Sequence, residues 1–271
     1  MAKTSWLKGF FFPIEHKELL VQLIKREIKQ RFQGSWLGLG WAILTPIAML
    51  AIYTFVFRTV LNAKWPSDPS SSNAEFALQL FSGLLVFTLF SEVVGRAPSL
   101  VSEQPNMVKK VIFPLAILPW VSVGASSFFA LLSLTVLIVG AFFAQGQLTI
   151  HLIALPLIGI SFLPILLGLG WLLSSLGVYL RDLGHIVGLI LTPLMFLSPI
   201  FYPTTALPEF VQSVMIFNPL ALIIESLRAV VLQGQWPNLI ALVTYLISTS
   251  FIAALGAFCF HKTRPGFADV L

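Results

Sequence analysis

Charge is scarce in this sequence. Asp, Glu, Lys and Arg together make up 10% of the 271 residues, whereas 57% of the residues are hydrophobic. A soluble domain usually carries about 25% charged residues. Because water does not solvate so apolar a surface, lipid is the expected solvent, and the long apolar runs predict an all-α integral membrane protein.

Cysteine is nearly absent, and the common nucleotide-binding and metal-binding motifs are missing. The single cysteine, Cys259, excludes an intrachain disulfide and a metal site built from thiolates. No Gly-Lys dipeptide occurs, so the P-loop that cradles ATP phosphates is absent. The four histidines lie singly, at His16, His151, His185 and His261. The sequence therefore predicts no catalytic residue, no metal and no cofactor in this chain.

Ionisable residues are absent from the centres of the apolar runs. Carriers that are coupled to protons or sodium ions generally bury such residues there. The net charge of +5 does not indicate nucleic acid, because the basic residues cluster at the ends of the runs, where they act as topology signals beside anionic lipid. The apolar patch near the N-terminus is too short for a cleavable signal peptide. We therefore expect a membrane chain whose energy comes from another subunit.

Six apolar runs are predicted to cross the membrane, since a helical span needs about 20 apolar residues. They lie at residues 32–57, at 76–95, in the two parts of 111–180 that Gln145-Gly146-Gln147 separates, at 183–208 and at about 237–260. Of the 16 Lys and Arg residues, Arg58, Lys64 and Arg228 would face the outer side and all others the cytoplasm. The positive-inside rule then places both termini in the cytoplasm, and residues 1–271 form a single transmembrane domain.

Residues 15–32 are predicted to form an amphipathic helix that lies in the membrane interface. Its apolar side chains recur at helical spacing, at Leu20, Val21, Ile24, Ile28 and Phe32. Its cations are Lys25, Arg26, Lys29 and Arg31. Such a helix places cations against anionic headgroups. A simple positively charged flank is the alternative, but it would explain the charge and not the periodicity.

The predicted cytoplasmic loop at residues 96–113 mixes apolar and charged side chains. It includes Ser99, Val101, Glu103, Met107, Lys109 and Lys110. A segment of this kind suits a short helix that docks into a groove on a soluble partner. A plain connector is equally compatible with the same residues.

Residues 202–237, on the predicted outer side, are unusually apolar for a loop. They predict two short helices broken at Asn218-Pro219, each too short to span the membrane. Such re-entrant pieces are tolerated at membrane depth only where protein or a water-filled cavity covers their ends. Glu225 and Arg228 lie three residues apart, so they either pair locally, which we favour, or meet a polar substrate.

The first predicted span is rich in aromatic residues, among them Trp36, Trp41, Tyr53 and Phe55. Most aromatic side chains of such a chain face lipid or form belts at the membrane interfaces. A minority on the inward face would offer stacking surfaces to sugar rings.

Five stretches, in order along the chain, resemble the permeases that export O-antigen, capsule and teichoic acid polymers. They are Gln30-Arg31-Phe32-Gln33-Gly34-Ser35-Trp36-Leu37-Gly38, Val111-Ile112-Phe113-Pro114-Leu115, Gly177-Val178-Tyr179-Leu180-Arg181-Asp182, Leu197-Ser198-Pro199-Ile200-Phe201-Tyr202-Pro203 and Asn218-Pro219-Leu220. The resemblance covers about residues 15–235 and fits the O-antigen permeases best. The tail after Lys262 carries no motif that can be assigned.

The resemblance implies a homodimer in the bacterial inner membrane, bound to two copies of an ATPase subunit that holds ATP and magnesium. It implies a coupling helix at about residues 97–110, with Arg181 and Asp182 as further coupling candidates, and an outer gate at residues 208–233 that contains Asn218, Pro219, Glu225 and Arg228. The implied substrate is a polymer on undecaprenyl diphosphate. Its headgroup would meet the cations of the N-terminal helix, and its sugars would slide along the aromatic residues of the first span.

Two alternatives stay open at this point. The chain could be an ATP-driven permease for another cargo, such as capsule, teichoic acid, a drug or a lipid. It could instead be a lipid-active membrane transferase, which needs a general base or metal ligands at the membrane surface. Asp182, His185 and Glu92 are the candidates for such a base, and they show no convergent spacing.

Overall fold

The computed structural model describes residues 16–31, 33–56, 73–108, 113–147, 149–204, 207–215 and 217–271. Within these ranges the chain is helical and has no strand, which agrees with the predicted all-α class. The elements are α2 (Lys17–Arg31), η2 (Gly38–Gly40), α3 (Trp41–Tyr53), α4 (Asn73–Arg96), η4 (Ala97–Ser99), α5 (Pro105–Val108), η5 (Leu115–Ile117), α6 (Leu118–Gln145), η6 (Ile150–Ala154), α7 (Leu155–Gly177), α8 (Leu183–Leu197), α9 (Glu209–Met215), α10 (Ala221–Val231), α11 (Leu239–Thr263), η8 (Arg264–Gly266) and α12 (Phe267–Val270).

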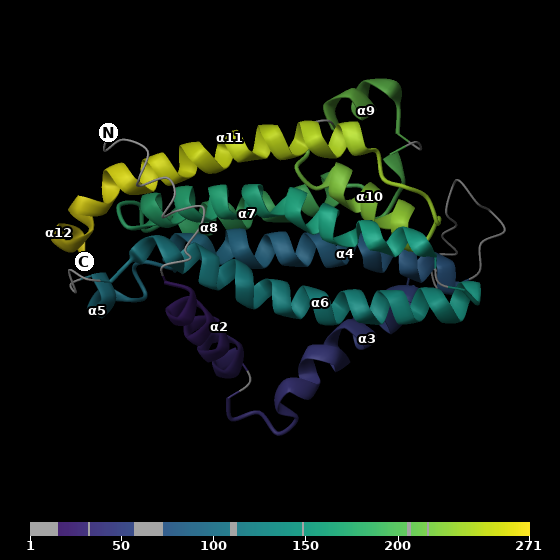
Figure 1. Ribbon diagram of the computed structural model, residues 1–271, viewed down its shortest axis with the longest axis horizontal. Helices are drawn as coiled ribbons and strands as arrows, with labels where there is room; N and C mark the ends of the chain where they lie inside the picture. The colour runs from purple at the N-terminus through teal and green to yellow at the C-terminus, as the bar shows by residue number, and fades with distance from the viewer. Residues whose placement is uncertain are drawn as a thin grey trace.

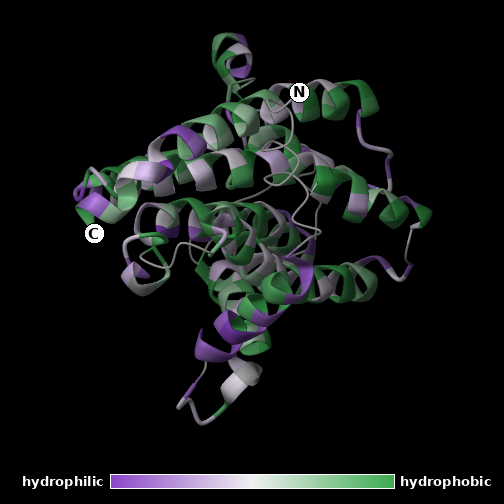
Figure 2. Ribbon diagram, turned by 60° about the vertical axis from the view of Figure 1, so that its left-hand side comes forward, coloured by the Kyte–Doolittle hydropathy of each residue, from purple (hydrophilic) through white to green (hydrophobic). Residues whose placement is uncertain are grey.

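Four long helices form the body of the molecule. α4, α6, α7 and α11 lie side by side along its long axis, and α8 packs against α4 and α7 (Figure 1). α2 and α3 lean away from this bundle next to α6. Hydrophobic residues cover most of the long helices (Figure 2), and one continuous core of buried apolar side chains joins them. We call the end that carries α5 and α12 the α5 end, and the opposite end the α10 end.

The lengths of the helices identify a multi-pass membrane protein. Within the described residues, four helices are long and apolar enough to span a bilayer, namely Ala74–Ser99, Leu115–Gln145, Ile150–Gly177 and Leu239–Val270. Two shorter apolar helices, Trp41–Val56 and Leu183–Leu197, stand where the first and fifth spans were expected. The 15 residues of α8 form a helix about 22 Å long, less than the hydrocarbon thickness of about 30 Å. The count of six spans therefore stays a prediction.

Local backbone geometry explains why these two helices are shorter than the apolar runs. Gly34 and Gly38 adopt φ values of 82° and 52°, so the chain turns there and α3 begins only at Trp41. Ser198 precedes Pro199 and is extended, with φ −87° and ψ 149°, because the proline ring disfavours helical geometry in the residue before it.

The predicted break between the third and fourth spans is confirmed. α6 ends at Gln145, and Gly146 adopts the left-handed conformation with φ 74°. The N–H of Gly146 donates to the carbonyl oxygen of Phe142 at 2.8 Å, which closes the last turn of the helix.

α7 and α11 pack through small residues. A Cβ atom on Gly256 would overlap the carbonyl oxygen of Gly168, and one on Gly168 would lie 2.8 Å from the Cα of Ala253. Only glycine allows two backbones to approach so closely, which is how membrane helices commonly maximise van der Waals contact. Beside this contact the fully buried Trp171 donates from Nε1 to the carbonyl oxygen of Ala116 at 2.9 Å.

The predicted N-terminal helix is present as α2, and its packing differs in detail from the expectation. Leu23 is buried against α6, with Leu20 and Ile24 half-buried beside it. Val21, which the periodicity placed on the same apolar face, is 47% exposed. The contact with α6 is close, since a Cβ on Gly124 would lie 2.5 Å from the Cδ1 of Ile24. The location of α2 in a membrane interface stays a prediction, and Phe32 lies outside the described residues.

Candidate functional site

Two ion pairs join α2 to the end of α4. The guanidinium of Arg31 donates two hydrogen bonds to the carboxylate of Glu92, at 2.5 Å and 3.1 Å. One turn away on both helices, Arg96 donates to Glu27. The Arg31 guanidinium also lies over the ring of Phe129 on α6, 4.4 Å from its centroid. We call these four charged residues the α2–α4 clamp.

The clamp engages the guanidinium of Arg31. The hydrogen bonds that it donates to Glu92 raise the pKa of Arg31 above its usual value, against the opposing effect of its partial burial. Arg31 was predicted to bind the headgroup together with Lys25, Arg26 and Lys29. The structure separates it from them, because those three side chains are exposed on the side of α2 that faces away from α6.

The two ion pairs of the clamp were not predicted from the sequence. Glu27 and Arg31 lie four residues apart on one helix, and Glu92 and Arg96 lie four apart on another. Residues at this spacing share a helix face. Each helix therefore presents one acidic and one basic side chain on the same face. This pattern could have indicated that the two helices pack antiparallel, with each acidic residue opposite a basic one.

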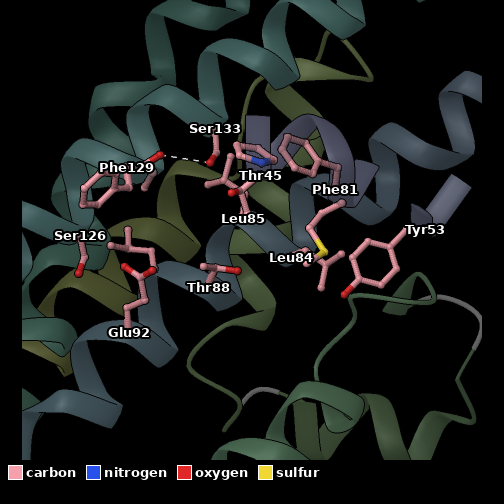
Figure 3. Close-up of a pocket in the computed structure, with 14 residues that line it drawn as sticks. Thr45, Tyr53, Phe81, Leu84, Leu85, Thr88, Glu92, Ser126, Phe129 and Ser133 are labelled. Atoms are coloured by element: carbon pink, nitrogen blue, oxygen red, sulfur yellow. Dashed lines mark hydrogen bonds between the residues drawn. The ribbon is translucent and has the colours of Figure 1, made fainter. Parts of the chain in front are cut away.

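A groove lined by apolar and hydroxyl-bearing side chains lies between α3, α4 and α6. Its cavity has a volume of about 250 Å³. Figure 3 shows hydroxyl side chains from all three helices around it, with the Glu92 carboxylate at one end and the Tyr53 ring at the other. The hydroxyls belong to Thr45, Thr88, Ser126 and Ser133, and the ring of Phe129 lies among them. We call this cavity the α3–α4–α6 groove.

The groove offers the two kinds of contact that bind sugars in proteins, namely hydrogen bonds and aromatic stacking. Its hydroxyl and carboxylate groups can exchange hydrogen bonds with a polar ligand, and its aromatic rings offer flat apolar faces. Of the four aromatic residues predicted to contact sugar, only Tyr53 lines the groove. Trp36, Trp41 and Phe55 are exposed on the outside of the chain, at 96%, 42% and 60%.

The predicted coupling loop, as far as residue 108, folds as η4, a turn and α5 at the end of the bundle. Glu103 is exposed, and Met107 is half-buried. Val101 is fully buried in the core of this chain, so it supports the loop from inside and offers no surface to a partner. Ser99 is half-buried and donates from Oγ to the carbonyl oxygen of Arg96.

Two of the four remaining predicted coupling residues are described by the structure, and two are not. Arg181 and Asp182 are exposed in the turn between α7 and α8. This turn lies close to the coupling loop, because α7 packs on η4 so tightly that a Cβ on Gly177 would overlap the carbonyl oxygen of Pro98. Lys109 and Lys110 lie outside the described residues.

Arg228 is fully buried at the α10 end and binds three parts of the chain. Its Nη2 donates to the carbonyl oxygens of Gln79 on α4, at 3.0 Å, and of Ile200 after α8, at 2.8 Å. Its Nε also donates to Ser82 Oγ at 3.2 Å. The favoured local pairing with Glu225 is present at 3.4 Å. The carbonyl contacts were not foreseen, since no sequence pattern identifies a backbone acceptor on a distant helix.

Asn218 and Pro219 hold the break between α9 and α10. The Oδ1 of Asn218 accepts from the backbone N–H of Leu220 at 2.9 Å, and its Nδ2 donates to the carbonyl oxygen of Leu197 at 3.2 Å. The hydroxyl of Tyr245 donates to the carbonyl oxygen of Pro219 at 2.7 Å. The two short helices were predicted correctly, whereas their re-entry into the membrane stays a prediction.

In the described part of the chain, no group of three His, Cys, Asp or Glu side chains lies close enough together to bind a metal ion. Glu92 is held by Arg31, whereas Asp182 and His185 lie at the start of α8. Of the three candidate bases of a transferase, Glu92 is therefore engaged in the α2–α4 clamp.

Known proteins resemble the chain along its whole length. A family model described as ABC-2 type transporter matches residues 18–232. The chain is 30% identical over 258 residues to an O-antigen export system permease protein RfbA of Myxococcus xanthus, covering 94% of this chain and 96% of that protein. It is 26% identical over 271 residues to a protein of the same name from Klebsiella pneumoniae, covering 99% of each. It is 25% identical over 247 residues to the polysialic acid transport protein KpsM of Escherichia coli, covering 89% of this chain and 92% of that protein. The chain belongs to the ABC-2 type transporter family.

Proposed function

We propose that this chain is the membrane-spanning permease of an ATP-driven exporter that moves polysaccharide linked to undecaprenyl diphosphate across the bacterial inner membrane. The observation that carries the proposal is the end-to-end similarity to permeases named for O-antigen export. O-antigen is therefore the proposed cargo. The similarity to a polysialic acid transport protein is lower and makes a capsule polymer the second candidate.

The energy for transport comes from a separate subunit in this proposal. The sequence contains no Gly-Lys dipeptide and hence no P-loop, whereas the transporter family is driven by ATP. We propose a homodimer of this chain with two copies of an ATPase subunit, which binds ATP and magnesium. Both termini lie in the cytoplasm, and the ATPase subunits dock at the α5 end.

The proposed binding site for the lipid headgroup lies on α2. Lys25, Arg26 and Lys29 are exposed together on one side of this helix. A diphosphate accepts charge-assisted hydrogen bonds from such cations. Arg31 is assigned a different role, because it is bound to Glu92 and holds α2 against α4.

The α3–α4–α6 groove is the proposed surface for the first sugars. It begins beside the clamp, so a headgroup at α2 would bring the attached sugars near Glu92 and the hydroxyls of the groove. Hydrogen bonds and ring stacking at each sugar are individually modest, so a polymer can be guided and still move on.

A deletion strain separates this function from that of a transferase. If the chain is the permease, its loss leaves complete lipid-linked polymer inside the cell, and the loss of the ATPase subunit has the same effect. If the chain is a transferase, its loss stops synthesis or leaves a shortened glycan. The measurement is the size and the sidedness of the lipid-linked polymer, by gel analysis of spheroplasts with and without an impermeant glycosidase.

A variant of the headgroup site gives a second readout. Replacing Lys25, Arg26 and Lys29 together by Gln should reduce export while the protein remains in the membrane at its normal level. A matched control replaces Lys17, Gln22 and Gln30 by Ala, outside the three-cation set. Equal export by both variants would remove α2 from the proposed mechanism.

A further inference from the structure

The C-terminal residues fold back against the α5 end of the bundle. Phe267 on α12 is fully buried and contacts Phe260 edge to face, with ring centroids 5.4 Å apart. Its ring also lies 6.1 Å from that of Tyr179, in the turn before α8. The hydroxyl of Tyr179 in turn donates to the carbonyl oxygen of Thr263 at 2.9 Å. α12 is therefore an ordered part of the fold.

Close packing fixes this C-terminal segment to both of the connecting loops. A Cβ on Gly266 would lie 2.6 Å from the hydroxyl oxygen of Tyr179, so the segment meets the turn before α8 at contact distance. Arg264 donates from Nη2 to the carbonyl oxygen of Phe113, at the far end of the coupling loop. The C-terminal segment therefore lies beside the coupling loop at the α5 end.

A cavity of about 400 Å³ opens between the coupling loop and the C-terminal segment. Its lining consists of Val108, Phe113 and Leu115 on the loop side, and of His261, Arg264, Pro265 and Ala268 on the C-terminal side. We call it the α5–α12 pocket. Figure 1 shows α5 and α12 together at one end of the molecule.

The pocket is lined mainly by apolar residues, with a histidine and an arginine among them. Five of these seven lining residues are apolar, and the other two are His261 and Arg264. Lys262, which follows His261 on α11, is exposed. Asp269 is exposed on α12 but does not line the pocket. The complementary surface is an apolar side chain flanked by carboxylates.

We propose that the α5–α12 pocket receives such a side chain from the ATPase subunit, so that the C-terminal segment forms part of the docking surface together with the coupling loop. This inference rests on the proposed function. Its argument is charge complementarity together with the physical continuity of the pocket with the coupling loop. Buried apolar anchors in preformed pockets dominate the affinity of protein interfaces.

Two substitutions on α12 form a matched test. Ala268→Trp fills the pocket, whereas Val270→Trp adds the same side chain to an exposed position of the same short helix that does not line the pocket. The assay is the affinity of the purified ATPase subunit for the permease in lipid nanodiscs. We expect Ala268→Trp to weaken binding by about tenfold or more, and Val270→Trp to change it by less than about twofold.

A third variant tests the charge without filling the pocket. Arg264→Gln retains a donor for the Phe113 carbonyl and removes the positive charge. We expect weaker ATPase binding and a smaller loss of affinity between low and high salt than in the wild type. Thermal unfolding in detergent checks that all three variants are folded.

The outcomes separate the two proposals. If the wild-type chain binds no ATPase subunit, the proposed function fails. If the wild type binds and both Ala268→Trp and Arg264→Gln bind equally well, the pocket inference is overturned while the proposed function stands. If Ala268→Trp weakens binding only when residues 1–15 are present, or alters only binding to anionic vesicles, then the occupant is this chain's own N-terminus or lipid, and the inference is likewise wrong.

Discussion

The α2–α4 clamp can be tested by removing its charges singly and together. Glu92→Gln takes the carboxylate from Arg31, Arg31→Gln takes the guanidinium from Glu92, and the double variant removes both. All three leave the apolar contacts between α2 and α6 in place. If the clamp holds α2 against α4, each single variant should loosen α2, and the double variant should cost less than the sum of the singles.

The expected magnitude follows from the geometry of the pair. The side chains of Arg31 and Glu92 are 45% and 22% exposed, so solvent screens their attraction. The contact is nevertheless bidentate, and exposed ion pairs of good geometry contribute about 1 kcal/mol. Since 1.4 kcal/mol corresponds to a factor of ten, loss of the pair should raise the population of undocked α2 about fivefold.

Hydrogen exchange measures this opening directly. In nanodiscs, the amides of the C-terminal half of α2 should exchange about fivefold faster in each single variant. Lys29→Gln is the control, because it removes a charge from the same helix on the side that faces away from α6. Exchange rates that match the wild type in both single variants, or effects that simply add in the double variant, would refute the clamp.

Three further variants probe the packing. Arg228→Met leaves the buried carbonyls of Gln79 and Ile200 without their donor, so it should lower the free energy of unfolding by about 3 kcal/mol, seen as an earlier thermal transition in detergent; an unchanged transition would contradict the assigned contacts. Gly256→Leu should force α11 away from α7 and cost about 1–3 kcal/mol in the same assay, and a stability equal to that of the wild type would count against the close crossing. Phe267→Ala should release α12, which limited proteolysis detects as cleavage near the C-terminus while the bundle stays intact; full protection of that site would show that α12 is held by other contacts.

The parts of the fold that the sequence predicted well are those that depend on local patterning. Scarce charge and long apolar runs identified a helical membrane protein, and Gly146 marked the turn between α6 and α7. The break at Asn218-Pro219 was placed correctly because proline lacks an N–H donor and asparagine caps turns. Each of these signals is carried by residues that are neighbours in the chain.

The parts that were missed depend on which helices become neighbours in space. Arg228 was expected to pair with Glu225, three residues away, and it does; its carbonyl acceptors lie on α4 and after α8, where composition gives no hint. Arg31 was grouped with the headgroup cations because its charge is the same, yet its position on the helix turns it toward Glu92.

Burial explains the remaining differences. Val101 was expected to contact a partner because it lies in a loop, but that loop packs onto α7 and buries it in the core. The tail after Lys262 carried no recognisable motif, although Phe267 anchors it to Tyr179 and Phe260. The sequence around Phe267 shows no periodicity that would have indicated its burial.

The most direct test of energy supply from outside this chain is transport in proteoliposomes. Vesicles that contain lipid-linked polysaccharide would be reconstituted with the chain alone, with the ATPase subunit alone and with both, and transfer of polymer across the bilayer would be followed with a protected-fraction assay. Transfer should require both proteins and hydrolysable ATP. Transfer by this chain alone, without nucleotide, would contradict the proposed division of labour.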